Sequence, residues 1–165
     1  MFHVFDEASV PARLSRRDWM ALLSRAPREM LESALAPRGL QPSSWLRQPE
    51  TGLMMVQGRV GGSGERFNLG EVTVTRCALR LPTAAGTVGV AYVLGRSHRQ
   101  AELAATADAL LQEPAEHATL VRSLLEPIQR HLAMLAAERQ ARAQTTRVDF
   151  LTVAREAGDD EDDDA

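Results

Sequence analysis

Hydrophobic and polar residues alternate on both sides of a glycine-rich link, Gly61-Gly62-Ser63-Gly64, near the middle of the chain. A period of two residues is typical of a strand with one buried face, so we expect strands at residues 53–60 and 67–81. Glycine adopts positive φ at little steric cost, and the link therefore predicts a tight turn. Together the two strands predict a central antiparallel β-hairpin.

Two further segments have strand-like patterns. Residues 45–47, Trp-Leu-Arg, predict a short edge strand. Residues 88–94 form a continuous apolar run, which predicts a strand that is buried on both of its faces. The sheet would then contain three or four strands.

Helical signals precede the hairpin. Ser15 and Asp18 form a capping-box pattern at the start of a first helix. Pro27 suits the first turn of a second helix, and Gly39 is placed to end it.

Helical signals also follow the last strand. Apolar residues recur at helical spacing over residues 97–112 and 116–144, and Pro127 should kink or split the second of these helices. The elements together predict an α+β fold, in which N-terminal and C-terminal helices pack on an antiparallel sheet with a central hairpin.

Charge is unevenly distributed along the 165 residues. The formal net charge is −3, but residues 156–165 contain seven of the 22 acidic residues. Residues 1–155 carry the other 15 acids and all 19 arginines, a net charge of +4. The acidic segment lacks large apolar side chains, so we expect a single domain over residues 1–155 and a disordered tail over 156–165.

Every basic residue is an arginine, and the chain contains no lysine. A Walker phosphate loop and a Schiff base both need a lysine amine, so both are excluded. The histidines show no metal-ligand spacing and no serine lies in a nucleophile elbow, so no catalytic or metal-ligating residue is predicted. Arginine instead favours interfaces or anionic ligands. Aromatic residues make up only 4% of the chain, which disfavours a nucleic-acid-binding module.

Cysteine usage and hydropathy indicate the compartment. Cys77 is the only cysteine, so an internal disulfide is impossible, which suits a reducing cytoplasm. No apolar run reaches the roughly 18 residues of a membrane span, and no N-terminal signal pattern is present. We expect a cytoplasmic protein without a membrane partner.

The glycine link lies between two arginines, Arg59 and Arg66. The backbone N–H groups of Gly61, Gly62 and Gly64 could form a nest that binds a phosphate between them. The alternative is a plain hairpin turn, because a strand and not a helix follows, and no helix dipole would add to the site.

An ordered set of short motifs resembles one known family over about residues 17–155. The motifs are Asp18-Trp19-Met20, Glu50-Thr51-Gly52-Leu53, Gly61-Gly62-Ser63-Gly64-Glu65-Arg66-Phe67, Thr75-Arg76, Val93-Leu94-Gly95-Arg96, Ala101-Glu102, Asp108-Ala109-Leu110-Leu111-Gln112 and Arg147-Val148-Asp149-Phe150. They resemble PhnG, the G subunit of the bacterial carbon–phosphorus lyase, which degrades organophosphonates.

The resemblance implies a subunit of the carbon–phosphorus lyase core complex, with two copies each of the G, H, I and J subunits and the I subunit as the most direct partner. The complex, with the L protein, forms α-D-ribose 1-methylphosphonate 5-triphosphate from ATP and methylphosphonate. The iron–sulfur cluster and S-adenosylmethionine belong to the J subunit. The G subunit would then support the reaction without binding a cofactor or catalysing alone. A second possibility is that its arginines also contact substrate phosphates.

Residues of these motifs are candidates for a subunit interface: Glu50, Thr51, Gly52, Arg76, Arg96, Arg147, Asp149 and Phe150. Arg76 lies in mid-strand and needs a carboxylate partner if it is buried, either Glu65 or Glu71 or a residue of a neighbouring subunit. Residues 147–150 follow the last helix, and they could pack on their own sheet or dock on a partner.

Overall fold

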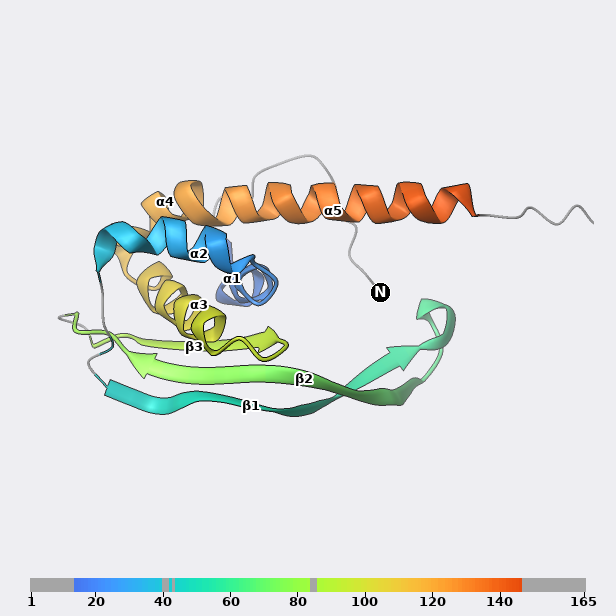
Figure 1. Ribbon diagram of the computed structural model, residues 1–165, viewed down its shortest axis with the longest axis horizontal. Helices are drawn as coiled ribbons and strands as arrows, with labels where there is room; N and C mark the ends of the chain where they lie inside the picture. The colour runs from blue at the N-terminus through green and yellow to red at the C-terminus, as the bar shows by residue number, and fades with distance from the viewer. Residues whose placement is uncertain (1–13, 40–41, 43, 84–85, 147–165) are drawn as a thin grey trace, which may run out of the picture.

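The computed structural model describes residues 14–39, 42, 44–83 and 86–146, and Figure 1 shows a layer of helices beside one sheet. The helices are α1 (Arg16–Leu23), α2 (Arg28–Leu35), η1 (Ala36–Arg38), η2 (Val60–Gly62), α3 (His98–Leu111), α4 (Pro114–Leu120), η3 (Val121–Leu125) and α5 (Glu126–Thr145). The strands are β1 (Ser44–Arg59), β2 (Arg66–Arg80) and β3 (Val88–Leu94). This arrangement confirms the expected α+β fold; the predicted tail over residues 156–165 lies outside the described residues.

The three strands form one antiparallel sheet in the order β1-β2-β3. The predicted edge strand at residues 45–47 and the predicted strand at 53–60 are one continuous strand, β1. The register is irregular between Trp45 and Arg47 and again between Arg47 and Glu50, where Pro49 lies. Proline has no N–H to donate, and bulges on an edge strand are where a sheet tolerates it. The predicted segments 45–47 and 53–60 can therefore belong to one strand.

The prediction that β3 is buried on both faces is wrong. Ala91 and Val93 are buried, whereas the alternate residues Tyr92 and Leu94 are 45% and 62% exposed. The helix α3 packs on β3 and β2 and covers the face that carries Ala91 and Val93. The apolar run reads as doubly buried in the sequence, but within the described residues the other face of β3 has no covering element at Tyr92 and Leu94.

The helix signals predicted from the sequence are present. The Ser15 hydroxyl accepts from the Asp18 N–H and the Asp18 carboxylate accepts from Ser15, which confirms the capping box. Pro27 occupies the cap position of α2, and Gly39 ends η1 with φ +55°.

The last helix is divided where Pro127 predicts a break. α4 passes into the π-helical turn η3, and Pro127 follows in the first turn of α5; the change in helix type lies where proline has no N–H to donate to the preceding turn. Residues 136–145 of α5 are all exposed. None of the described helices combines the length and apolarity that crossing a bilayer requires.

One buried carboxylate joins three elements of the fold. Asp108 of α3 is fully buried and accepts hydrogen bonds from the Arg16 guanidinium at 2.7 and 3.2 Å and from Trp19 Nε1 at 2.9 Å. It also accepts the Val90 N–H of β3 at 3.0 Å. The hydrogen bond to Asp108 raises the pKa of Arg16. Asp108 therefore fixes α1 and the outer edge of β3 to α3.

The single thiol, Cys77 of β2, is buried in the core. Cys77 donates to the Ala101 carbonyl, and burial raises its pKa to about 12. An unperturbed thiol has a pKa near 8.5, so at pH 8 the thiolate fraction of the folded chain is about a thousandfold lower than that of the unfolded chain. We expect a disulfide reagent to label Cys77 about a thousandfold more slowly in the native chain than in the unfolded chain. The labelling reaction is followed by absorbance. Equal labelling rates while circular dichroism still reports a folded chain would contradict this.

Candidate subunit interface

A two-stranded ribbon projects from the sheet. β3 pairs with β2 only from Val74 to Arg80, so residues 53–73 form a hairpin without a third strand, which we call the arm. Figure 1 shows the arm extending well beyond β3 and α3, in the same direction as the exposed end of α5. An isolated hairpin is marginally stable in water because it buries little apolar surface. The arm therefore needs a partner surface to be held rigidly.

The arm exposes an unusual share of large apolar side chains. Six of the 11 large hydrophobic side chains that are exposed in the described residues lie in it, and they are Leu53, Met54, Met55, Val60, Phe67 and Leu69. Val60 is 74% exposed and Leu53 is 65% exposed. Scattered apolar residues are normal on a protein surface, whereas a contiguous group marks a site of interaction.

The strand register places three of these six side chains, Met54, Phe67 and Leu69, on one face. Met54 lies opposite Val72, and Phe67 lies opposite Gly58. A Cβ atom added to Gly58 would lie 2.6 Å from Leu69 Cδ1, so Leu69 covers Gly58 on that same face. Successive residues of a strand point to opposite faces. The apolar arm face comprises Met54, Val56, Phe67, Leu69 and Val72.

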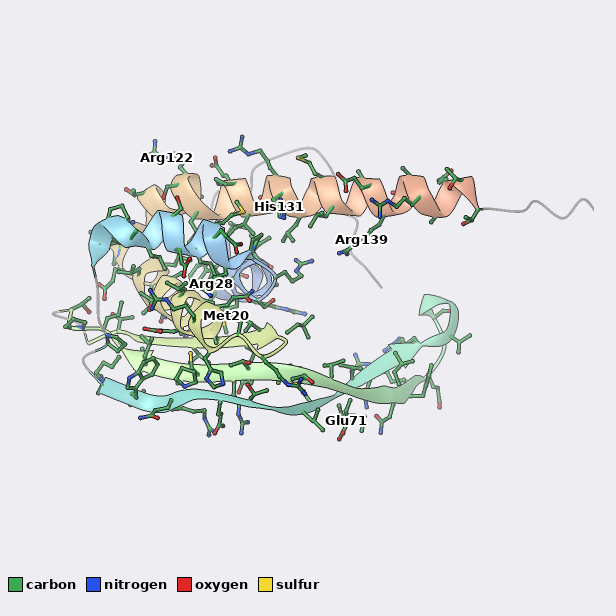
Figure 2. The ribbon with its side chains drawn as sticks, in the orientation of Figure 1. Met20, Arg28, Glu71, Arg122, His131 and Arg139 are labelled. Atoms are coloured by element: carbon green, nitrogen blue, oxygen red, sulfur yellow. The ribbon has the colours of Figure 1, made fainter. Side chains whose placement is uncertain are left out.

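The opposite face of the arm is mixed, because Leu53 and Met55 point to it beside polar side chains. Gln57 Nε2 donates to Asn68 Oδ1 at 3.1 Å, and Glu71 belongs to this face through its pairing with Met55. Figure 2 shows the Glu71 side chain pointing away from the helical layer. At this point of the ribbon the apolar arm face is consequently turned toward the side on which α5 lies.

The tip of the arm brings the predicted phosphate-binding residues together. Arg59 and Arg66 lie directly opposite each other in the β1–β2 pairing. Gly61 has φ +58°, and the Gly64 N–H donates to the Val60 carbonyl at 3.1 Å, which confirms the predicted hairpin turn. Phosphate binding by this loop stays a prediction.

The base of the arm contains the first group of predicted interface residues. Glu50 accepts from Arg76 Nε at 2.7 Å and is also paired with Arg47, so the carboxylate partner of Arg76 is Glu50 and not Glu65 or Glu71. Arg76 and Glu50 are cross-strand neighbours, which the longer β1 makes possible. Hydrogen bonds from Arg47 and Arg76 hold the pKa of Glu50 below its ordinary value.

Thr51 and Gly52 continue this group. Thr51 Oγ1 lies 3.1 Å from Thr75 Oγ1 and 3.1 Å from Nε2 of His98, the first residue of α3. Gly52 has open space where a Cβ would lie, and Arg96 is exposed after β3. The other predicted interface residues, Arg147, Asp149 and Phe150, lie outside the described residues.

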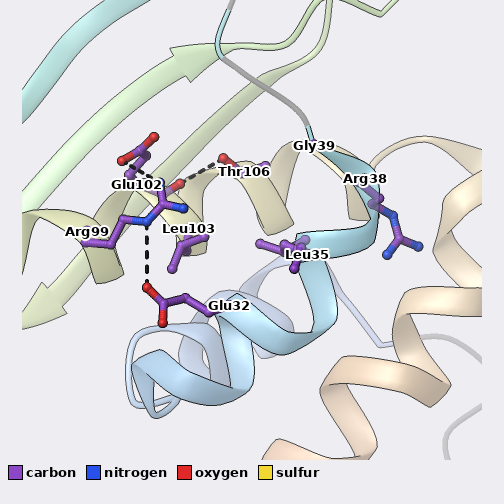
Figure 3. Close-up of a pocket in the computed structure, with 9 residues that line it drawn as sticks. Glu32, Leu35, Arg38, Gly39, Arg99, Glu102, Leu103 and Thr106 are labelled. Atoms are coloured by element: carbon purple, nitrogen blue, oxygen red, sulfur yellow. Dashed lines mark hydrogen bonds and ion pairs between the residues drawn. The ribbon is translucent and has the colours of Figure 1, made fainter.

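A surface pocket of about 290 Å³ lies between α2 and α3 (Figure 3). Arg99 in this pocket pairs with Glu102 at 3.0 Å and lies 3.8 Å from Glu32. A single guanidinium thus faces two carboxylates, and Arg38 at the rim pairs with Glu116. These charges satisfy one another, so the pocket offers no free cation to an anionic ligand. Among the described residues, no group of three or more His, Cys, Asp or Glu side chains is placed to share a metal ion.

The sequence did not single out the apolar arm face. The alternation of Met54, Val56, Val72 and Val74 indicated strands, and a buried face was expected beneath them. The face is exposed because β3 ends at Leu94 and leaves the arm without a third strand. The signal that could have revealed this face was the length of the β1–β2 hairpin, which is greater than the length of β3.

Comparison with known proteins identifies the family. The model of the family described as phosphonate metabolism protein PhnG matches residues 14–156. A curated relative from Rhizobium meliloti is 43% identical over 154 residues, which cover 91% of this chain and 93% of the relative. That relative is described as alpha-D-ribose 1-methylphosphonate 5-triphosphate synthase subunit PhnG. The chain therefore belongs to the PhnG family of phosphonate metabolism proteins.

Proposed function

We propose that this protein is the G subunit of a multi-subunit enzyme that makes α-D-ribose 1-methylphosphonate 5-triphosphate from ATP and methylphosphonate in phosphonate degradation. The observation that carries the proposal is the apolar arm face, which the chain does not cover with any of its described residues. A surface of this kind is suited to burial against another subunit. The printed description of the 43% identical relative, a subunit of such a synthase, supports the same role.

The proposal places the arm against the I subunit, the most direct partner, in a cytoplasmic complex that also contains the H and J subunits and has two copies of each. In this proposal the complex also requires the L protein for its activity. ATP and the iron–sulfur cluster with S-adenosylmethionine are assigned to the other subunits. The assignment is supported by the burial of the one thiol of this chain, which donates to a backbone carbonyl inside the core. The chain then acts by completing and stabilising its partner.

The arm face can be tested by a double substitution, Phe67→Ser with Leu69→Ser. Each apolar side chain buried in an interface contributes about 1–2 kcal/mol, so we expect at least a tenfold loss of affinity for the I subunit. The measurement is capture of the full chain by the tagged I subunit after co-expression.

Met134→Ser provides a matched control, because Met134 is 64% exposed but lies on α5. It should leave capture unchanged. An equal loss in both variants would show that the arm is not the docking surface. Failure of the unaltered chain to bind any subunit of the synthase would reject the proposed function.

A further inference from the structure

β1 is an edge strand with a regular stretch whose outer side pairs with no other strand among the described residues. The irregularities of its pairing with β2 lie between Trp45 and Glu50 and between Val56 and Gln57. Between Glu50 and Val56 the register advances one residue at a time. This stretch contains no proline, and no residue within 51–56 is charged.

Two hydrogen bonds fix the direction of the backbone groups in β2. The Gly95 N–H donates to the Thr73 carbonyl at 2.9 Å, and the Leu81 N–H donates to the Thr87 carbonyl at 3.1 Å. Both contacts are made on the β3 side of β2. Backbone groups in a strand alternate between its two neighbours, so odd-numbered residues of β2 in this region bond toward β3 and even-numbered ones toward β1.

The same alternation fixes the free groups of β1. Val72 and Val74 are even-numbered residues of β2, and they lie opposite Met54 and Gly52. Met54 and Gly52 therefore direct their N–H and C=O groups inward, to β2. The residues that present both groups to the free edge are Thr51, Leu53 and Met55.

Such an edge is a template for another strand. Soluble proteins usually protect long edges with charges, proline or bulges, and residues 51–56 have none of these devices. Leu53, Met54 and Met55 are exposed in addition. Addition of one strand would convert the two-stranded arm into a three-stranded sheet, which is far better able to hold its shape.

The charges at the two ends of the stretch indicate the occupant. Glu50 is already bound by Arg47 and Arg76. Beyond the other end, past the irregularity at Val56 and Gln57, Arg59 faces Arg66, and neither has an ion-pair partner among the described residues. Like charges directly opposite each other in a sheet repel, so this end favours an added carboxylate. A second copy of β1 could offer only its own Glu50, which is occupied.

We infer that a partner subunit of the synthase adds a strand along Thr51–Met55 of β1 and places a carboxylate beside Arg59. The inference rests on the proposed function and specifies how the partner is recognised. Backbone hydrogen bonds at the odd-numbered residues supply the contact, and the arginine end sets the direction of the added strand.

A proline at Leu53 tests the backbone contact. Leu53→Pro removes an N–H that points to the free edge and leaves the inward hydrogen bonds of the arm in place. Leu53→Thr is the matched control, because it loses the same apolar side chain but keeps the N–H. We expect capture by the I subunit to fall about tenfold or more for proline relative to threonine, with equal melting temperatures of the two chains. Equal capture would overturn the inference.

Hydrogen exchange gives a second test that does not depend on a substitution. The amides of Thr51, Leu53 and Met55 should exchange at least about tenfold more slowly in the assembled complex than in the isolated chain. The amides of Gly52 and Met54 are already bonded to β2 and should change less. Unchanged exchange at the odd-numbered residues would overturn strand addition. Protection that grows with the concentration of the isolated chain would show that a second copy is the occupant.

Charge reversal at Arg59 tests whether the partner places a carboxylate beside this residue. Arg59→Glu should weaken capture, and raising the salt concentration should reduce the difference from the unaltered chain. If Arg59→Glu leaves assembly intact but lowers turnover of ATP and methylphosphonate, the arginine pair binds phosphate and the carboxylate is ruled out. A complex that forms normally while all three tests fail would reject this inference alone; absence of any complex would reject the proposed function.

Discussion

Replacing Asp108 with asparagine is expected to lower the free energy of unfolding by about 3 kcal/mol. Asp108 is fully buried, and its two carboxylate oxygens accept from Arg16, Trp19 and the Val90 N–H. An asparagine of the same shape loses the charge and turns an NH2 group toward these donors. This expected loss lies at the low end of the range for breaking a buried ion pair, because the Arg16 side chain is 45% exposed and regains hydration.

The measurement is thermal unfolding of the full chain by circular dichroism. A loss of about 3 kcal/mol in a domain of this size corresponds to a fall in melting temperature of about 6–12 °C. Glu32→Gln serves as a control, because it removes the exposed ion pairs with Arg28 and Arg99 and should cost less than about 1 kcal/mol. A melting temperature for Asp108→Asn within about 2 °C of the unaltered chain would show that Asp108 does not hold α1, α3 and β3 together.

Replacing Gly89 with alanine is expected to be at least as disruptive. A Cβ atom at this position would lie 1.9 Å from the Ala105 carbonyl oxygen and 2.9 Å from Ala109 Cβ. Both obstacles are fixed parts of α3, so the helix or β3 has to move as a unit. Overpacking of a core costs about 1–3 kcal/mol where flexible side chains can yield, and a clash with helix backbone belongs at or above the top of that range.

Gly52→Ala is the matched control for this substitution. Gly52 lies in β1 of the same sheet, and nothing approaches within 4 Å of a Cβ atom built there. We expect Gly89→Ala to lower the melting temperature by about 6 °C or more and Gly52→Ala to change it little. Similar melting temperatures for the two variants would show that α3 does not approach β3 as closely as the structure indicates.

Short-range signals were sufficient for much of the fold. The capping box of Ser15 and Asp18, the turn around Gly61 and the break near Pro127 depend on a few adjacent residues, and all three are present. Each acts through backbone geometry that is local in the chain. The sequence could predict these features because no distant residue is needed to form them.

The two predictions that the structure contradicts, the burial of β3 and the partner of Arg76, failed for the same physical reason. The apolar run of β3 reads as buried on both faces, but α3 covers only one of them, and Tyr92 and Leu94 are exposed. The partner of Arg76 is Glu50, on a strand that runs further than its pattern indicates. In each case the outcome depends on which element lies alongside, and a periodic pattern in one segment does not contain that information.

The fold brings together part of the candidate interface set, whose role as an interface stays a prediction. The Glu50-Thr51-Gly52 segment and Arg76 do lie together at the base of the arm. The apolar arm face was missed, because its exposure follows from the difference in length between the β1–β2 hairpin and β3. The buried Asp108 was visible only as part of a motif, since its donors Arg16, Trp19 and Val90 come from α1 and β3.

The amino-acid sequence by itself determined the element types, the central turn, the absence of lysine chemistry and the family, because these depend on composition, on neighbouring residues or on the order of short motifs. Only the tertiary structure decided which faces are covered, which charges pair and which surface is left apolar. Burial and ion pairing join residues that are distant in the chain, so they are properties of the packed elements and cannot be read from any one of them.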